Sequence, residues 1–561
     1  MHILYGLLLF TLLGETHALK PAQTDPVVEI RNGPLQGIRS STYDQDFFLG
    51  IPYAQPPLGN LRFRPPQPLN TTWQEPRSVE EYSPVCYQEG GGQLVGSDDC
   101  LSINVVRPAG IDASAKLPVL VFIHGGGFFN GSNSAPAQNL SFIVQESVRM
   151  GSPIIAVNLN YRLHIFGFLW GPVVEAAGLG NLGLRDQRLA LEWIHENIES
   201  FGADPTKVTI WGSSAGALSV GSHLTLNGGR DDGLFRGAIF SSGSGLVSEF
   251  GEVPRSPTWE GAYQQLQEAT GCTSVNDSLQ CLRELPAHEL GQIALNISFP
   301  SFLHIIDGVF IQQPRHESLR QGKFIHVPII HGITSDDGDA TAIGSSINTT
   351  QQWESWIRAS TGANNESIQA ISALYPDIPR LGLPETLSGR PTGELAHYGA
   401  QWKRALAFAG DRDFHAPKRA VVRHWASLNL TAYSYHFNVY TKDLDIARGV
   451  GHFAELPFIF MNTEGAGYQN RIDPFAGTPD SYKEVARIMG RMWISFANHL
   501  NPNQNGVVDG QWPRYDLRSP QNIVFDANVT SLVFTEPDTY RSEQIEYLNS
   551  KMFNLSLESG V

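Results

Sequence analysis

A serine between two glycines is the first residue whose surroundings suggest chemistry. The run KVTIWGSSAGA at residues 207–217 places Ser214 between Gly212 and Gly216, directly after an apolar stretch. Small neighbours permit a sharp turn from a strand into a helix, with the Ser214 hydroxyl at its apex. A base could activate that hydroxyl to attack a carbonyl carbon. The pattern alone is weak, because a chain with 55 glycines also produces it by chance as an ordinary turn.

A histidine and three aspartates could complete such a site. His452 lies in the glycine-rich run GVGHFAEL, just before an apolar segment. Asp336, Asp337 and Asp339 follow a strand-like run, where parallel sheets place functional loops. A histidine base oriented by a carboxylate activates a serine. The residues themselves leave open which aspartate is the acid.

Glycines after another apolar run could stabilise the negative charge that the attack creates. The run FIHGGGFF at residues 122–129 contains Gly125, Gly126 and Gly127. Backbone N–H groups of Gly126, Gly127 and Ala215, the residue after the nucleophile, would form an oxyanion hole. Each run alone is an ordinary tight turn. Together, in this order and each after a strand-like run, they favour catalysis over coincidence.

Short apolar runs that alternate with amphipathic segments must position these residues. Strand-like runs begin near residues 117, 152, 207, 235, 326 and 431. This alternation predicts an α/β fold with a large, mostly parallel central sheet flanked by helices. Residues 181–202 predict one such helix, with an apolar stripe of Leu189, Trp193, Ile194, Ile198 and Phe201. Residues from about 345 to 400 lack strand signals and are expected to form helices and loops.

Composition limits the domain count and the partners. The 561 residues show no repeat, low-complexity tract or linker, so we expect a single large domain at 19–561. The glycines at 90–92 predict a flexible surface loop and no domain boundary. The net charge is -16, the pI is near 5.5, and no five like charges occur in a row. These values argue against a nucleic-acid partner and against a polybasic membrane patch.

The N-terminus predicts export. Ile3–Leu13 form an apolar stretch too short to span a bilayer, and T-H-A follows, with cleavage expected after Ala18. We therefore expect a signal peptide at 1–18, with an uncleaved anchor as the alternative. The C-terminal FNLSLESGV has neither a retention signal nor a lipid-anchor signal, so a freely secreted protein is expected. Ten sequons predict N-linked glycans: Asn70, Asn130, Asn139, Asn276, Asn296, Asn348, Asn365, Asn429, Asn528 and Asn554.

Four cysteines fit an oxidising compartment. Of the three possible pairings, proximity in the chain favours Cys86 with Cys100 and Cys272 with Cys281. Metal binding is the alternative, but no C-x-x-C pair or nearby histidine cluster supports it. We expect neither a metal nor a cofactor.

Eight segments resemble the hallmark segments of the cholinesterase and type-B carboxylesterase-lipase family of α/β-hydrolases. They are FLGIPYAQPPLGNLRFRPP (48–66), SDDCLSINV (97–105), GGGFF (125–129), NYRLHIFGFL (160–169), NLGLRDQRLALEWI (181–194), FGADPTKVTIWGSSAG (201–216), SSGS (241–244) and GVGHFAEL (449–456). The resemblance implies the α/β-hydrolase fold and a triad of Ser214, His452 and Asp337, with Ser242 supporting the acid. It also implies structural ion pairs of Arg62 with Asp98 and of Arg162 with Asp186.

Departures from the family pattern narrow the expected substrate. The acid of the family is usually glutamate, and Ser213 stands where the family usually has another glutamate. The Cys86–Cys100 segment holds no tryptophan. A cholinesterase uses that anionic and aromatic environment to bind a quaternary ammonium, so acetylcholine is not the expected substrate. The same segment is also short for a large interfacial lid.

The resulting hypothesis is a secreted serine carboxylesterase or lipase that acts on neutral, apolar, small-molecule esters through an acyl-enzyme. It would have no integral membrane association. The alternative is a catalytically silent protein of the same fold that mediates adhesion or sequesters apolar ligands. The filled triad positions argue against adhesion, whereas a sequestering protein could use the same pocket.

Overall fold

The computed structural model describes residues 25–247, 257–273, 275–299, 302, 304–342, 346–469, 472–507 and 511–551. The predicted signal peptide at 1–18 and the sequon at Asn554 lie outside these residues.

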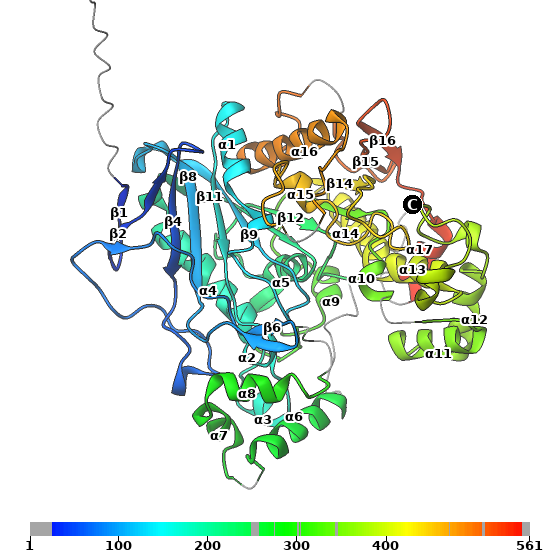
Figure 1. The fold of residues 1–561 in the computed structure, drawn as a ribbon, viewed down its shortest axis with the longest axis horizontal. Coiled ribbons are helices and arrows are strands. Elements are labelled where there is room, and N and C mark those ends of the chain that lie inside the picture. Colours follow the sequence, from blue (N-terminus) through cyan, green and yellow to red (C-terminus); the bar gives the residue numbers. More distant parts are fainter. Residues whose placement is uncertain are drawn as a thin grey trace, which may run out of the picture.

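An eleven-stranded sheet forms the centre of the molecule (Figure 1). Across the sheet the strands are β16 (Val533–Pro537), β15 (Gln521–Phe525), β14 (Ala432–Phe437), β13 (Ile329–Thr334), β12 (Gly237–Ser241), β11 (Ala203–Ser213), β9 (Leu117–Ile123), β10 (Ile155–Leu159), β8 (Ser102–Pro108), β4 (Gln45–Pro52) and β3 (Ile38–Ser40). The neighbours from β15 to β10 pair in parallel, and the outer pairs are antiparallel. The predicted α/β fold with a mostly parallel central sheet is confirmed.

Two apolar cores lie on opposite faces of this sheet, because side chains alternate between faces along each strand. In β9, Val121 and Ile123 belong to one core, whereas Leu120 and Phe122 belong to the other. The first core also contains α4 (Leu182–Asn197), α5 (Ala215–Gly229) and α14 (Ala416–Ser427). The second contains α1 (Ser141–Arg149), α15 (Leu456–Ile459) and α16 (Asp480–His499). Burial on both faces explains why the central strands contain continuous apolar runs, as in LPVLVFI of β9.

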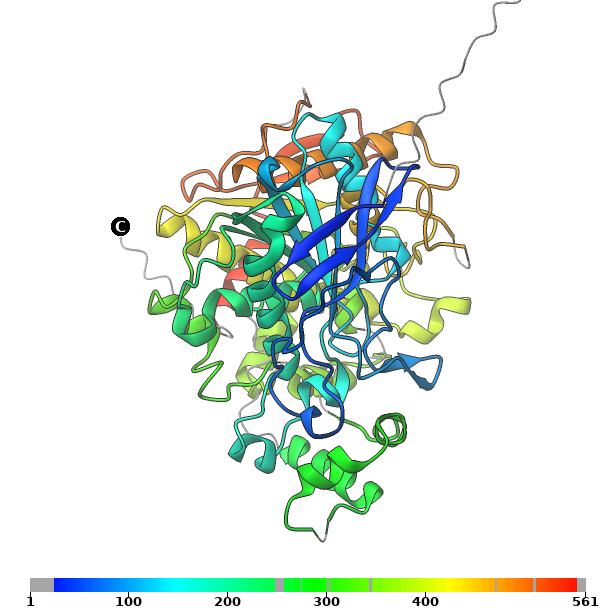
Figure 2. The ribbon, with the colours of Figure 1, turned by 90° about the vertical axis from the view of Figure 1, so that its left-hand side faces the viewer.

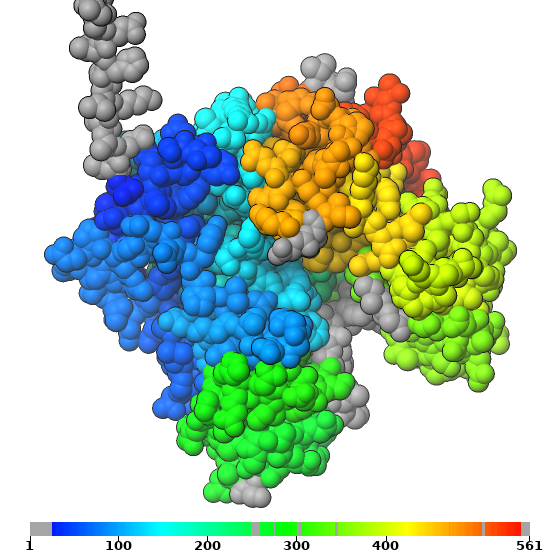
Figure 3. All heavy atoms as spheres, viewed as in Figure 1, coloured from blue at the N-terminus to red at the C-terminus, as the bar shows by residue number. Residues whose placement is uncertain are grey.

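The remaining helices form smaller layers around the sheet. They are α2 (His164–Phe168), α3 (Pro172–Ala176), α6 (Pro257–Thr270), α7 (Ser278–Glu284), α8 (Ala287–Ala294), α9 (Arg315–Arg320), α10 (Asp339–Ala342), α11 (Thr350–Thr361), α12 (Asn365–Leu374), α13 (Trp402–Gly410) and α17 (Ser542–Lys551). Helices α11, α12, α13 and α17 share a third apolar core. Figure 3 shows α6–α8 (green) at the bottom and α11–α12 (yellow-green) at the lower right as two separate lobes of the molecule. None of the described helices is long and apolar enough to cross a bilayer.

The six strands and the helix predicted from the sequence form at the predicted residues. All six apolar runs form strands of the sheet, β9 to β14, and the predicted helix is α4. Most of its apolar stripe is buried, and Leu189 is half-buried. Residues 345–400 contain α11, α12 and 3-10 turns in their described part, as expected. A small N-terminal sheet adds β1 (Val27–Ile30), β2 (Gly33–Gln36) and β5 (Arg77–Ser78) beside the main sheet (Figure 2).

The segment between Cys86 and Cys100 differs from its prediction. It forms a β-hairpin of β6 (Gln88–Gly90) and β7 (Gln93–Val95), where a flexible loop was expected. Gly91 and Gly92 both have positive φ, at 64° and 82°, which is the requirement of a two-residue hairpin turn. Gly91 and Gly92 therefore permit the tight turn that joins β6 to β7. On its far side the Leu94 N–H donates to Gln292 Oε1 of α8 at 3.1 Å.

Both disulfides join the cysteines that proximity favoured. Cys86 bonds to Cys100, and Cys272 bonds to Cys281. The predicted pairing is confirmed. The first disulfide closes the base of the β6–β7 hairpin, and the second ties the end of α6 to α7.

Candidate active site

Ser214 occupies the turn between β11 and α5. Its φ is 56° and its ψ is -123°, a strained conformation that recurs at functional sites. Its N–H donates to the Ser241 carbonyl at 2.9 Å, which fixes the turn to the neighbouring strand. A Cβ on Gly212 would lie 2.2 Å from the Gly216 backbone, and one on Gly216 would lie 2.0 Å from the Ile123 carbonyl. Both glycines are therefore required for the turn.

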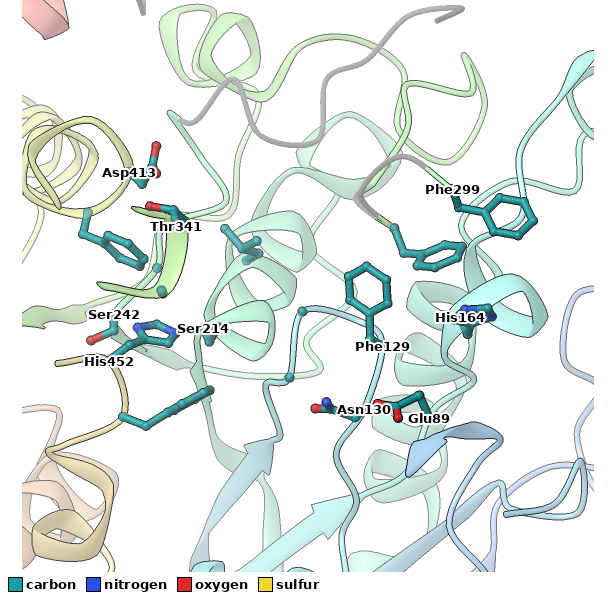
Figure 4. A pocket seen from close by; sticks show the side chains of 18 of the residues that line it. Glu89, Phe129, Asn130, His164, Ser214, Ser242, Phe299, Thr341, Asp413 and His452 are labelled. Carbon is teal, nitrogen blue, oxygen red and sulfur yellow. The ribbon is translucent and has the colours of Figure 1, made fainter. Parts of the chain in front are cut away.

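The His452 ring lies beside Ser214 in the same pocket (Figure 4). It is carried by the loop that precedes α15, and its side chain is buried. Nδ1 is 2.7 Å from Asp337 Oδ1. Because Asp337 engages Nδ1, Nε2 is the ring nitrogen left for a second partner.

Asp337 is fully buried at the end of β13. One oxygen faces His452, and the other accepts hydrogen bonds from Ser242 Oγ and from the Thr334 N–H, both at 2.8 Å. Three donors orient one carboxylate, so its direction is fixed before any substrate arrives. The structure brings Ser242 to this acid, where the family resemblance placed it.

The two neighbouring aspartates face the backbone of the histidine loop. Asp336 Oδ2 accepts the Val450 N–H at 2.8 Å, and Asp339 Oδ1 accepts the His452 N–H at 2.7 Å. Asp339 Oδ2 also pairs with Arg448, whose Nε is 2.7 Å away. Neither aspartate faces the His452 ring. They hold the histidine loop against the end of β13, a role that the sequence did not suggest.

Charges around His452 favour its protonated form. Burial lowers the pKa of His452, but the hydrogen bond and charge of Asp337, with the charges of Asp339 and Glu455, raise it above its ordinary 6.5. Glu455 is itself fully buried, and burial together with Asp337 raises its pKa to about 7. Sequence reasoning missed Glu455; its place three residues after His452 in GVGHFAEL was the available signal.

The glycine loop after β9 forms a wall of the pocket. Gly126 and Gly127 have φ of 100° and 61°, which favour glycine, and both line the pocket with Ser214. The Gly126 carbonyl accepts the Asn130 N–H at 3.1 Å, and a Cβ on Gly126 would lie 2.1 Å from the Asn130 carbonyl oxygen. Ala215 is the first residue of α5, so its N–H is among those left without an intrahelical partner.

The pocket has a volume of about 850 Å³ and extends from the Ser214 turn to a group of phenylalanine rings near His164. Ser242 and His452 lie at the same end as Ser214, and Phe299 and His164 lie at the other (Figure 4). Further walls come from Glu89 of the hairpin, from Asp413, Phe414 and Arg448, and from the end of α8 and the residues after it, namely Ala294, Leu295, Ile297, Ser298, Phe299 and Phe302. These wall residues were not found from the sequence, because separate loops meet only in the fold.

Two buried ion pairs stabilise the surroundings of the site. Arg62 Nη2 is 3.0 Å from Asp98, and Arg162 Nη2 is 2.6 Å from Asp186. Both implied pairs are confirmed. Arg62 also donates to the Leu285 carbonyl at 2.6 Å, which connects the hairpin segment to the end of α7. In the described part of the chain, no cluster of three His, Cys, Asp or Glu side chains could hold a metal ion.

Comparison with known proteins finds matches along nearly the whole chain. A family model described as the carboxylesterase family matches residues 24–547. Lipase 4 of Diutina rugosa is 35% identical over 535 residues, which cover 88% of this chain and 90% of that lipase. Secreted lipase 1 of Botryotinia fuckeliana is 30% identical over 567 residues, which cover 93% and 92%. The crystal structure of Aspergillus niger EstA has a TM-score of 0.78 at 29% identity, and the match covers 94% of this chain and 98% of EstA.

Proposed function

The chain belongs to the carboxylesterase family and is a carboxylic ester hydrolase, and from this premise we propose that it cleaves neutral, apolar esters through an acyl-enzyme on Ser214. The observation that carries this proposal is the arrangement of the Asp337 carboxylate, the His452 ring and the Ser214 turn at one end of a large pocket. The mostly apolar lining beyond that end favours an apolar substrate.

In the first half of the reaction, Ser214 Oγ attacks the ester carbonyl carbon while His452 Nε2 takes the hydroxyl proton. Asp337 keeps the proton of His452 on Nδ1 and stabilises the imidazolium that forms. The N–H groups of Gly126, Gly127 and Ala215 stabilise the oxyanion of the tetrahedral intermediate. When that intermediate collapses, the bond to the alcohol oxygen breaks and His452 gives its proton to the leaving alcohol.

In the second half, water replaces the alcohol. His452 Nε2 takes a proton from this water, whose oxygen attacks the acyl carbon. The bond to Ser214 Oγ then breaks, the proton returns to the serine, and the carboxylic acid leaves. Apart from the ester and the water, every group that takes part in this cycle is a side chain or a backbone N–H group of the chain.

We also propose that the protein is secreted. The apolar N-terminal stretch with its cleavage site, two disulfides and a secreted relative support this location. Collection of the mature protein from the medium, with its first residue identified by mass spectrometry, tests both the export and the cleavage after Ala18.

Hydrolysis of p-nitrophenyl esters from acetate to palmitate tests the chemistry. Ser214→Ala should lose on the order of a thousandfold or more in kcat, because the nucleophile is gone. Ser213→Ala is the matched control, since it removes the neighbouring hydroxyl, whose buried oxygen has no hydrogen-bond partner among the residues that the structure describes. The chain-length optimum separates a carboxylesterase from a lipase. Equal rates for wild type and Ser214→Ala would contradict the proposal and favour a ligand-sequestering protein.

A further inference from the structure

His164 lines the pocket at the end away from the catalytic serine (Figure 4). It begins helix α2, and its φ is 53°, in the left-handed region that most residues avoid. Its backbone N–H donates to the Phe128 carbonyl at 2.8 Å, which holds the strained residue against the glycine loop. Strain of this kind persists where the surrounding structure enforces it, and it is common at ligand sites.

The His164 ring has no hydrogen-bond partner among the described residues, although the residue is only 5% exposed. Nδ1 is completely buried and unpaired. Because Nδ1 is enclosed, Nε2 is the ring nitrogen that can meet a ligand in the pocket. Burial lowers the pKa of His164 to about 4, so the ring is neutral at ordinary pH.

Other buried histidines lack this combination of features. His124 contacts the Gly125 carbonyl at 2.9 Å, and His223 contacts Gln187 at 3.0 Å. His331 also has unpaired nitrogens, but it stacks on Phe240 in the core and does not line the pocket. His164 alone among these is unpaired, strained and part of the pocket wall.

Phenylalanine rings surround the His164 ring. The ring centroid of Phe302 lies 4.5 Å away, that of Phe299 6.1 Å away and that of Phe129 6.3 Å away. All three side chains line the pocket. Such a wall favours an aromatic group, because ring edges and faces attract each other beyond the area that they bury. A neutral imidazole within it adds one polar contact at a fixed place.

We propose that His164 is a specificity residue that hydrogen-bonds a hydroxyl group on an aromatic ring of the substrate. The preferred esters would then be hydroxyphenyl esters, with the ring among Phe129, Phe299 and Phe302 and the carbonyl carbon at Ser214. A hydroxyl both donates and accepts, so it suits either tautomer of His164. A carboxylate on the substrate would instead favour a positively charged partner, which the neutral His164 ring does not provide. The inference rests on the proposed ester hydrolysis and names its substrate class.

Matched ester pairs test the proposal, each differing only by hydroxyl against methyl on the ring. Methyl 4-hydroxycinnamate and methyl 4-methylcinnamate place the ring on the acyl side. The acetates of 2-(4-hydroxyphenyl)ethanol and 2-(4-methylphenyl)ethanol place it on the alcohol side. In wild type, kcat/KM should favour the hydroxyl ester roughly three- to tenfold in at least one pair, as for one neutral hydrogen bond. In His164→Phe, which keeps a ring without nitrogens, this ratio should fall to about one or below.

Two further variants keep the test interpretable. His164→Gly removes the nitrogens and suits the positive φ, so it replaces the Phe variant if that variant does not fold. His195→Phe, at an exposed position of α4, is the matched control and should leave the hydroxyl preference unchanged. Equal ratios in wild type and in both His164 variants would overturn the proposal.

Binding can be measured without turnover, and this measurement tests the role of His164 independently of the proposed ester hydrolysis. In a Ser214→Ala background the same esters bind but are not cleaved, so their Kd values can be compared directly. A hydroxyl preference in Kd that disappears in Ser214→Ala/His164→Phe supports the recognition site even if no ester is hydrolysed. Identical Kd ratios with and without the His164 ring would contradict it, whatever the catalytic outcome.

Discussion

Within five residues of chain, Asp336, Asp337 and Asp339 point their carboxylates at three different targets. Asp337 reaches the His452 ring, whereas the other two accept backbone N–H groups of the histidine loop. The type of residue is the same at all three positions. The turn after β13 sets the direction of each side chain. Asp337 can therefore orient the His452 ring, whereas Asp336 and Asp339 hold the loop that carries it.

The pH dependence of activity should reflect the charges around His452. Its raised pKa means that the neutral base is lost as the pH falls through a value above 6.5, and kcat/KM should fall with it. The charges that raise this pKa belong to Asp337, which contacts the ring, and to Asp339 and Glu455 nearby, and Arg448 pairs with Asp339.

Asp339→Asn should shift the acid limb of this profile to lower pH. The amide oxygen can still accept the His452 N–H, but a negative charge is lost and the Arg448 charge is no longer paired. The fraction of maximal kcat/KM that remains at pH 5.5 should therefore be larger in the variant. Asp231→Asn, at an exposed site, is the control. An unchanged limb in Asp339→Asn would show that Asp339 has no electrostatic effect on the base.

Asp336 should make folding stability depend on pH. Burial raises its pKa from 3.8 to about 8, so its contribution is present at low pH and is lost as pH rises through about 8. Asp336→Asn removes this titration. The free energy of unfolding of the variant, relative to wild type, should thus grow by a few kcal/mol between about pH 4 and 8.

Urea unfolding of both proteins at several pH values within this range measures that difference. Asp231→Asn serves again as the control, because it changes an exposed aspartate in the same way. A constant difference between wild type and Asp336→Asn across the range would mean that Asp336 stays ionised in the folded protein.

Among the structural elements, the glycine loop after β9 leaves no room for a larger residue at Gly126. Gly126→Ala would place a Cβ 2.1 Å from the Asn130 carbonyl oxygen in a backbone of φ 100°. The loop would have to move, and the N–H groups proposed as oxyanion donors would move with it. We expect kcat for p-nitrophenyl acetate to fall on the order of a hundredfold or more.

Gly178→Ala is the matched control for this loop. Gly178 also has a positive φ, of 65°, but open space surrounds its Cβ position. This change should lower stability by about 1 kcal/mol and leave kcat within a factor of two. If both variants lost activity equally, general destabilisation would explain the result and the glycine loop would have no special role.

Much of the sheet was predictable, because a strand buried on both faces needs a continuous apolar run, as in β9 and β11. The serine and glycine motifs were visible because each follows such a run, and the histidine motif was visible because its glycine-rich run precedes an apolar segment. The β6–β7 hairpin was missed, since Gly91 and Gly92 signal flexibility and a tight turn equally well. His164 and Phe302 could not be assigned to one pocket, because 138 residues separate them in the chain.

For the molecule as a whole, the glycosylation sites should mark the solvent-facing surface. Nine of the ten sequon asparagines lie among the described residues; all are exposed except Asn139, which is half-buried. We expect glycans on the secreted protein. Enzymatic removal of N-linked glycans should lower its mass measurably, and intact-mass spectrometry checks this. An unchanged mass would contradict passage through the glycosylating compartment.

The strand order of the sheet has a consequence for synthesis. From β11 to β16 the strands neighbour one another in chain order, so each newly made strand can join the edge left by its predecessor. The nucleophile turn follows β11, whereas His452 follows β14. In a nascent chain the serine is therefore made well before its proposed base. An interrupted product that ends before the histidine loop would lack that base, together with α15 and α16 of the second core, so we expect it to have no hydrolytic activity.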